Sequence, residues 1–189
     1  MNTRTDSWHS GHLDRTVAVA RWGVFGRPVL VFPTAGGDAE EIERFHVVDA
    51  CADLVAAGRV KLYSCDSANG RAMLTHEGDS FHRSWILRQF VEFVRHELVP
   101  AIRADCRSDD IEIVVAGASI GAYNALASLC RHPDVFSHAI CMSGTYDLTR
   151  FLDGPGNEHF HWASPIHHVG DLGGEHLAHL PQRIAEYAC

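Results

Sequence analysis

One serine stands between two glycines where a buried strand passes into a helix. The motif GASIG, residues 117–121, follows the apolar run at 111–116 and opens a helical pattern at 120–131. A serine in so sharp a turn has strained dihedral angles, so the residues two positions away on either side must have almost no side chain. Gly117 and Gly121 meet this requirement. The pattern therefore predicts a strand, a tight turn carrying Ser119, and a helix.

This context makes Ser119 a candidate nucleophile. A strand, a G-x-S-x-G turn and a helix together form the nucleophile elbow of α/β-hydrolases. The N-terminus of the helix below the serine offers free N–H groups and the positive end of a dipole. We expect the N–H of Ile120 to be one donor of an oxyanion hole. The alternative is a tight turn with an inert serine.

A second candidate segment is the loop PTAGGD at residues 33–38, directly after another buried strand. In α/β-hydrolases the loop after the corresponding strand supplies the other oxyanion donor. Ala35 is the predicted donor, with an uncertainty of one residue in either direction. The alternative is a glycine-rich loop that only changes the direction of the chain.

Apolar runs alternate with helical patterns along the chain. The buried strands show no polar alternation, which favours a mostly parallel sheet covered on both faces. A short turn joins the first two strands, so we expect them to be antiparallel neighbours. The predicted strands are 16–21, 28–32, 60–65, 111–116 and 136–142, and the predicted helices are 39–57, 81–105 and 120–131.

The pattern weakens after Ser143. Residues 151–189 form an irregular, histidine-rich tail, in which 175–187 could be a short helix broken by Pro181. A length of 189 residues suits one domain with a sizeable core. We therefore expect a single α/β-hydrolase-like domain over residues 1–189.

Composition excludes several function classes. The net charge of −8 argues against a nucleic-acid surface and disfavours acidic membranes. No apolar stretch is long enough for a membrane span, and the N-terminus has none of signal-peptide length. The six cysteines form no CxxC pair, which is typical of buried thiols in a reducing compartment. The expected location is the cytoplasm.

The chain resembles the α/β-hydrolase-fold esterases, in particular the group related to esterase D and antigen 85. The resemblance covers roughly residues 8–152. It implies a serine esterase that cleaves a small-molecule carboxylic ester through an acyl-enzyme on Ser119, with no cofactor and no metal. Its segments are 26–34 (GRPVLVFPT), 36–41 (GGDAEE), 117–124 (GASIGAYN) and 142–147 (MSGTYD).

The sequence departs from that family after Ser143. The family places an acid and then a histidine after two further strands, but only 46 residues follow Ser143 and they contain no clear buried strand. We therefore expect a three-layer sandwich with a mostly parallel sheet whose C-terminal strands are missing. The chain is then either a truncated form of a longer esterase or one that has rebuilt its triad.

The sequence offers several candidates for the acid and the base of the triad. Asp147 follows the strand 136–142 and could orient a base, although a helix N-cap is the favoured interpretation. A base must come within hydrogen-bond reach of Ser119. The sequence does not select one, and the cluster from His159 to His179 is the main candidate. The histidines after Ser119 are His132, His138, His159, His161, His167, His168, His176 and His179.

Two further hypotheses follow from the C-terminal part. The histidine-rich tail could bind a metal, but its spacing matches no HExxH motif, so we expect none. If the last strands are missing, the strand 136–142 becomes a sheet edge and invites a homodimer through that edge. The alternative to an esterase is therefore an inactive or truncated hydrolase scaffold that serves as a binding module.

Overall fold

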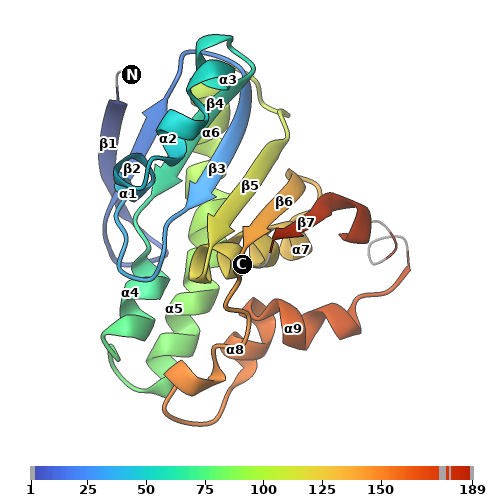
Figure 1. Cartoon of the computed structure of the whole chain (residues 1–189). Helices are drawn as coiled ribbons and strands as arrows, with labels where there is room; N and C mark the ends of the chain where they lie inside the picture. The colour runs from blue at the N-terminus through green and yellow to red at the C-terminus, as the bar shows by residue number, and fades with distance from the viewer. Residues whose placement is uncertain (1–2, 175–177, 179, 188–189) are drawn as a thin grey trace.

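A mostly parallel sheet crosses the molecule, with its strands in the order β1-β2-β4-β3-β5-β6-β7 (Figure 1). The computed structural model describes residues 3–174, 178 and 180–187. β1 and β2 form an antiparallel hairpin, β2 is antiparallel to β4, and the other pairs run parallel. The strands are β1 (Thr3–Ser10), β2 (Arg15–Trp22), β3 (Arg27–Phe32), β4 (Val60–Cys65), β5 (Ile113–Ala118), β6 (Phe136–Met142) and β7 (Ile184–Tyr187).

Helices cover both faces of the sheet and complete three layers. On one face, side chains such as Phe90, Phe93 and Leu129 pack against Leu30 and Val115 of the sheet. On the other face, short helices cover part of the sheet near β2, β3 and β4. These helices are α5 (Ser80–Phe93), the π-helical segment η1 (Val94–Leu98), α6 (Val99–Cys106) and α7 (Ile120–Arg131) on the first face, and α1 (Glu41–Arg44), α2 (Val47–Ala50) and α3 (Ala52–Ala56) on the second.

The structure confirms the three-layer α/β architecture and several predicted elements. The helix α7 and the strand β6 have the predicted bounds. The predicted helix 81–105 corresponds to α5, η1 and α6, with Pro100 in the first turn of α6. Among the described residues, no helix is long and apolar enough to cross a membrane.

The predicted helix 39–57 is wrong as a single element. Three short helices replace it, because the chain turns at His46, where φ is +60°, and again at Cys51. A left-handed residue cannot continue a right-handed helix. Each short helix still buries an apolar residue against the sheet: Ile42, Val48 or Val55.

The prediction that the first two core strands are neighbours is also wrong. β4 lies between β2 and β3 and pairs with both. The connection at residues 23–26 passes over the start of β4, where Cβ atoms on Gly23 or Gly26 would lie 3.5 and 2.7 Å from backbone atoms of Val60. The other edge of β2 is occupied by β1, a largely exposed polar strand that carries little apolar signal.

The C-terminal tail contains more structure than its composition suggests. β7 pairs parallel with β6 through residues 139–142 and 184–187, so the edge of the sheet lies at β7 and not at the strand 136–142. Residues 184–187 are thus a strand and not part of a helix. The remaining elements are the 3-10 turns η2 (Thr149–Phe151), η3 (Val169–Asp171) and η4 (Leu180–Arg183) and the helices α8 (Glu158–Ala163) and α9 (Pro165–His168).

Candidate active site

Ser119 lies at the joint between β5 and α7 with a strained backbone. Its φ is +56° and its ψ is −121°, a region that residues other than glycine rarely occupy. Ser119 is the N-cap residue of α7, but its side chain makes no capping hydrogen bond. The residue is half-buried and so remains partly open to solvent.

The two glycines of the motif are required by close contacts. A Cβ atom on Gly117 would lie 2.3 Å from the backbone carbon of Gly121, and one on Gly121 would lie 2.4 Å from the carbonyl oxygen of Phe32. Both distances are shorter than atoms tolerate. The turn therefore brings the first turn of α7 directly against the end of β3.

The loop at residues 33–38 runs beside the start of α7. Ala35 packs against the same apolar cluster that contains Ile120. Within the described part of the chain, the N–H groups of Ala35 and Ile120 have no hydrogen-bond acceptor. Both predicted donors are thus unused and come from adjacent segments.

A buried carboxylate shapes this loop, which sequence reasoning missed. Glu41 of α1 accepts hydrogen bonds from the N–H of Thr34 at 2.7 Å and from its hydroxyl at 3.0 Å. Gly37 leaves room for that carboxylate, because a Cβ there would lie 2.2 Å from Glu41 Oε2. Glu41 therefore fixes the loop one residue before Ala35.

A short helix braces the same loop from another side. Residues 66–80 carry no predicted helix or strand, but α4 (Ala68–Leu74) lies there. A Cβ on Gly70 would lie 2.9 Å from the Cα of Ala35, so α4 packs directly on the loop. The Asn69 side chain, fully buried, donates to Oδ1 of Asn124 on α7 at 2.7 Å. The loop is thus held between α4 and α7.

Thr145 is the side chain that meets the serine hydroxyl. Its Oγ1 lies 3.3 Å from Ser119 Oγ, and its N–H donates to the Ser119 carbonyl at 3.1 Å. Thr145 follows β6, next to the elbow, because β5 and β6 pair in parallel up to Met142. Thr145 belongs to the family segment 142–147, but no sequence signal distinguishes it as a site residue.

The described histidines of the tail have other partners. His161 Nε2 lies within hydrogen-bond distance of Asp171 Oδ2, at 2.9 Å. His167 Nδ1 lies 2.8 Å from Ser164 Oγ, and His168 Nδ1 donates to the Ser164 carbonyl at 2.8 Å. These contacts join α8, α9 and η3 to one another.

Elsewhere the histidines also lie away from the elbow. His159 Nδ1 is 3.5 Å from Arg88, His132 ends α7, and His138 is exposed on β6. In residues 3–174, 178 and 180–187, no histidine nitrogen lies within hydrogen-bond distance of Ser119 Oγ. The candidates His176 and His179 lie outside the described residues.

Asp147 occupies a local turn. Its Oδ1 accepts from the N–H of Thr149 at 2.9 Å and from the hydroxyl of Thr149 at 2.5 Å. These hydrogen bonds hold the pKa of Asp147 below its usual value. The carboxylate is exposed and lies two residues before η2, whose N-cap residue is Leu148, so Asp147 is not the N-cap that the sequence pattern favoured.

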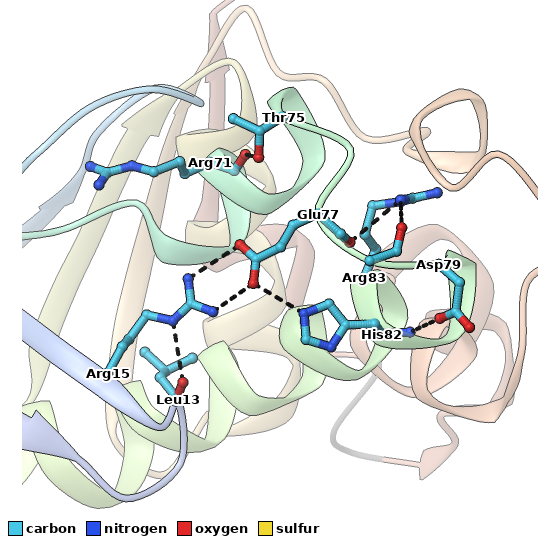
Figure 2. A network of polar contacts seen from close by, with 9 residues as sticks. Leu13, Arg15, Arg71, Thr75, Glu77, Asp79, His82 and Arg83 are labelled. Atoms are coloured by element: carbon cyan, nitrogen blue, oxygen red, sulfur yellow. Dashed lines mark hydrogen bonds and ion pairs between the residues drawn. The ribbon is translucent and has the colours of Figure 1, made fainter.

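An ionic network anchors the junction of α4 and α5 (Figure 2). Glu77 accepts from Arg15 at 2.8 Å and lies 3.0 Å from His82 Nε2. Arg83, nearly fully buried, donates to the Gly78 carbonyl at 2.6 Å and to the Leu152 carbonyl. The network thus ties α5 to the β1–β2 hairpin and to the segment that follows η2.

The described residues show no group of three metal-binding side chains. The histidine-rich tail instead uses its rings in pairwise contacts such as His161 with Asp171. The expectation that the chain binds no metal stays a prediction.

The sheet order, the three layers and the strained serine at a strand–helix joint define the α/β-hydrolase type of protein. The sequence matches the model of the family described as "Putative esterase" over residues 32–177. The chain therefore belongs to this esterase family. A search of the curated proteins gave no match.

Solved structures support the same fold. A ferulic acid esterase superposes with a TM-score of 0.66 at 20% identity, over 94% of this chain and 74% of that one. MPT51 of Mycobacterium tuberculosis gives a TM-score of 0.71 at 17% identity, over 100% of this chain and 74% of that one. The enterobactin esterase of Shigella flexneri gives 0.66 at 18% identity, over 100% of this chain and 54% of that one.

Proposed function

We propose that the chain hydrolyses small-molecule carboxylic esters through an acyl-enzyme on Ser119. The observation that carries this proposal is the backbone of Ser119, which is strained at the N-terminus of a twelve-residue helix. Such strain at a surface turn persists only where the surrounding structure enforces it, and it is typical of functional sites. The family membership supports the same class of reaction.

In the proposed reaction Ser119 Oγ attacks the ester carbonyl carbon and transfers its proton to a base. The tetrahedral intermediate places its negative oxygen near the N–H groups of Ile120 and Ala35, which stabilise it together with the dipole of α7. Collapse breaks the bond to the alcohol, which leaves with a proton. Water then attacks the acyl-enzyme and releases the carboxylic acid.

Thr145 is the proposed positioning residue for the serine. Its hydroxyl lies near Ser119 Oγ at 3.3 Å, and its backbone N–H fixes the carbonyl of the same residue. This contact selects one rotamer of the serine side chain. The Thr145→Val variant should therefore lower kcat more than it changes KM, since the substrate still binds.

The proposed reaction needs a general base, and variants of the candidate histidines identify it. A serine without its base loses most of its catalytic rate, although the oxyanion hole retains a small part. His176→Asn and His179→Asn variants test the two candidates outside the described residues. His161→Asn is the matched control, because His161 pairs with Asp171.

Hydrolysis of 4-nitrophenyl acetate by the purified chain tests the proposal. We expect turnover that falls by at least about a thousandfold in Ser119→Ala. Ser108→Ala is the control, since the Ser108 hydroxyl donates to Asp110 in the loop between α6 and β5. Equal turnover in the wild type and Ser119→Ala would overturn the proposal. No turnover in the folded wild type would do the same and would favour the inactive scaffold.

A further inference from the structure

An open cavity of about 630 Å³ lies at the opposite end of the sheet from Ser119. It is bordered by the turn at residues 23–26, the start of β4 and the end of α6. The six residues of β5 separate this end from the elbow, a distance of roughly 20 Å. The cavity is therefore separate from the candidate active site.

Positive side chains from four elements gather in this cavity. Arg4 of β1 and Arg21 of β2 are directly opposite each other in the hairpin, so their side chains share one face. Like charges in that position destabilise a sheet. Lys61 of β4 and Arg107, which ends α6, add two more cations. This concentration stands out in a chain with a net charge of −8.

Two carboxylates neutralise only part of this charge. Asp105 binds Lys61 at 2.5 Å and Arg21 at 2.9 Å, and it also accepts from Tyr63 at 2.7 Å. Asp6 binds Arg21 at 3.2 Å. Because Asp105 already receives three donors, it has little capacity for a further cation.

The other positive groups of the cavity keep hydrogen-bond donors that a ligand can use. Among the described residues, no acceptor lies within bonding distance of the guanidinium groups of Arg4 and Arg107. Lys61 is 4% exposed and uses one of its three donors in the ion pair with Asp105. The site therefore combines a buried ammonium with two exposed guanidinium groups.

An apolar wall stands beside these charges. Val24 is 84% exposed and Phe25 is 67% exposed, and both line the cavity together with Ile111. The Phe25 ring is held in place over Gly58, where a Cβ would lie 2.0 Å from the ring. Exposed apolar side chains at a cavity rim are typical of ligand sites.

We propose that this cavity binds a small organic anion, with a phosphate or carboxylate group at Arg4, Lys61 and Arg107. The aromatic or apolar body of the ligand packs on Val24 and Phe25. Charge-assisted hydrogen bonds supply the orientation, and the volume is that of a site for a small molecule. The site does not depend on the chemistry proposed for Ser119.

Cys106 provides a reporter inside the cavity. This half-buried thiol lines the cavity, whereas Cys51 is half-buried outside it. Alkylation of both thiols by iodoacetamide, followed by peptide mass spectrometry, compares the chain with and without 2-naphthyl phosphate. We expect protection of Cys106 and none of Cys51. 2-Naphthoate tests the carboxylate in the same way, and 2-naphthol and inorganic phosphate test each half of the ligand alone.

Two variants remove charges from the cavity without a change in fold. Arg107→Asn keeps a residue type that tolerates the φ of +54° found there, and Arg4→Gln replaces an exposed strand residue. Arg59→Gln is the matched control, an exposed arginine at the same end of the sheet that does not line the cavity. Calorimetry should show binding of 2-naphthyl phosphate weakened about tenfold by each cavity variant and unchanged in the control.

Three results would overturn the proposal. The first is equal alkylation of Cys106 with and without 2-naphthyl phosphate and 2-naphthoate. The second is an equal loss of binding in Arg59→Gln and the cavity variants. Binding would then depend on the general positive charge at this end of the sheet and not on contacts inside the cavity. The third is an affinity for inorganic phosphate or for 2-naphthol equal to that for 2-naphthyl phosphate. Equal affinity for inorganic phosphate would show that the apolar wall does not contribute, and equal affinity for 2-naphthol would show that the anionic group does not.

Discussion

The buried amides of Asn69 and Asn124 join α4 to the helix that follows the serine. Asn69 Nδ2 donates to Asn124 Oδ1 at 2.7 Å, and the two side chains are 0% and 1% exposed. Asn69 Oδ1 also accepts from the N–H of Gly70, the residue that packs on Ala35. One polar pair thus links α4 and α7 to the loop beside the serine.

Asn69→Ala should destabilise the chain, because it leaves the Asn124 amide buried without its partner. The expected loss is about 1–3 kcal/mol in the free energy of unfolding, measured with urea. The double variant Asn69→Leu/Asn124→Leu should lose less than the sum of the single variants Asn69→Leu and Asn124→Leu. Additive losses would show that the pair does not act as a unit.

Gly121→Ala should disrupt the elbow, since its Cβ would lie 2.4 Å from the Phe32 carbonyl oxygen. We expect a loss of at least about 2 kcal/mol in the free energy of unfolding, together with loss of esterase activity. The matched control is Gly173→Ala, where nothing lies within 4 Å of the added Cβ. A tolerated Gly121→Ala would contradict the close packing of α7 on β3.

Glu41→Gln should loosen the loop that carries Ala35. The variant keeps the size of the side chain. It weakens the hydrogen bonds from Thr34, because in the wild type their acceptor is a carboxylate and in the variant it is a neutral amide. We expect kcat for ester hydrolysis to fall about tenfold, with KM little changed. Glu40→Gln is the control, because Glu40 is exposed and bonds Thr5 at the surface. A change in KM alone would argue against a role in the transition state.

Stability should fall as the pH drops from 6.5 toward 4. Burial, and then the nearby Arg131, lowers the pKa of His168 to about 4. Between about pH 6.5 and pH 4 the unfolded chain therefore binds a proton at His168 that the native state does not bind. His168 therefore contributes stability above pH 6.5 that is lost as the pH falls, up to about 3 kcal/mol.

His168→Gln tests this assignment. Urea unfolding at pH 7.5, 5.5 and 4.5 should show a smaller loss of stability with acid in the variant than in the wild type, even though the variant is less stable at pH 7.5. Equal slopes against pH in the two proteins would exclude His168 as the group responsible.

The elbow was predictable from sequence because its constraints are local. Glycines two residues on either side of Ser119 and the flanking strand and helix are all visible in one segment. The contacts of Glu41 with Thr34 and of Asn69 with Asn124 were not predictable, since each depends on how separate elements pack. Thr145 meets Ser119 only because β5 and β6 pair in register.

Other errors have the same origin. β4 lies between β2 and β3 because the connection at residues 23–26 passes over its start. The spacing of the strands along the sequence does not reveal such a crossing. β7 was missed because its four residues are few and only partly buried. The single domain over residues 1–189 and the homodimer through a sheet edge stay predictions, and the edge to test is now β7.

Labelling with a fluorophosphonate probe tests the central claim most directly. The account predicts that the folded wild type gains one covalent phosphonyl group, that peptide mapping places it on Ser119, and that Ser119→Ala gains none. An unlabelled wild type, or a label that persists in Ser119→Ala, would contradict an activated serine at the joint between β5 and α7.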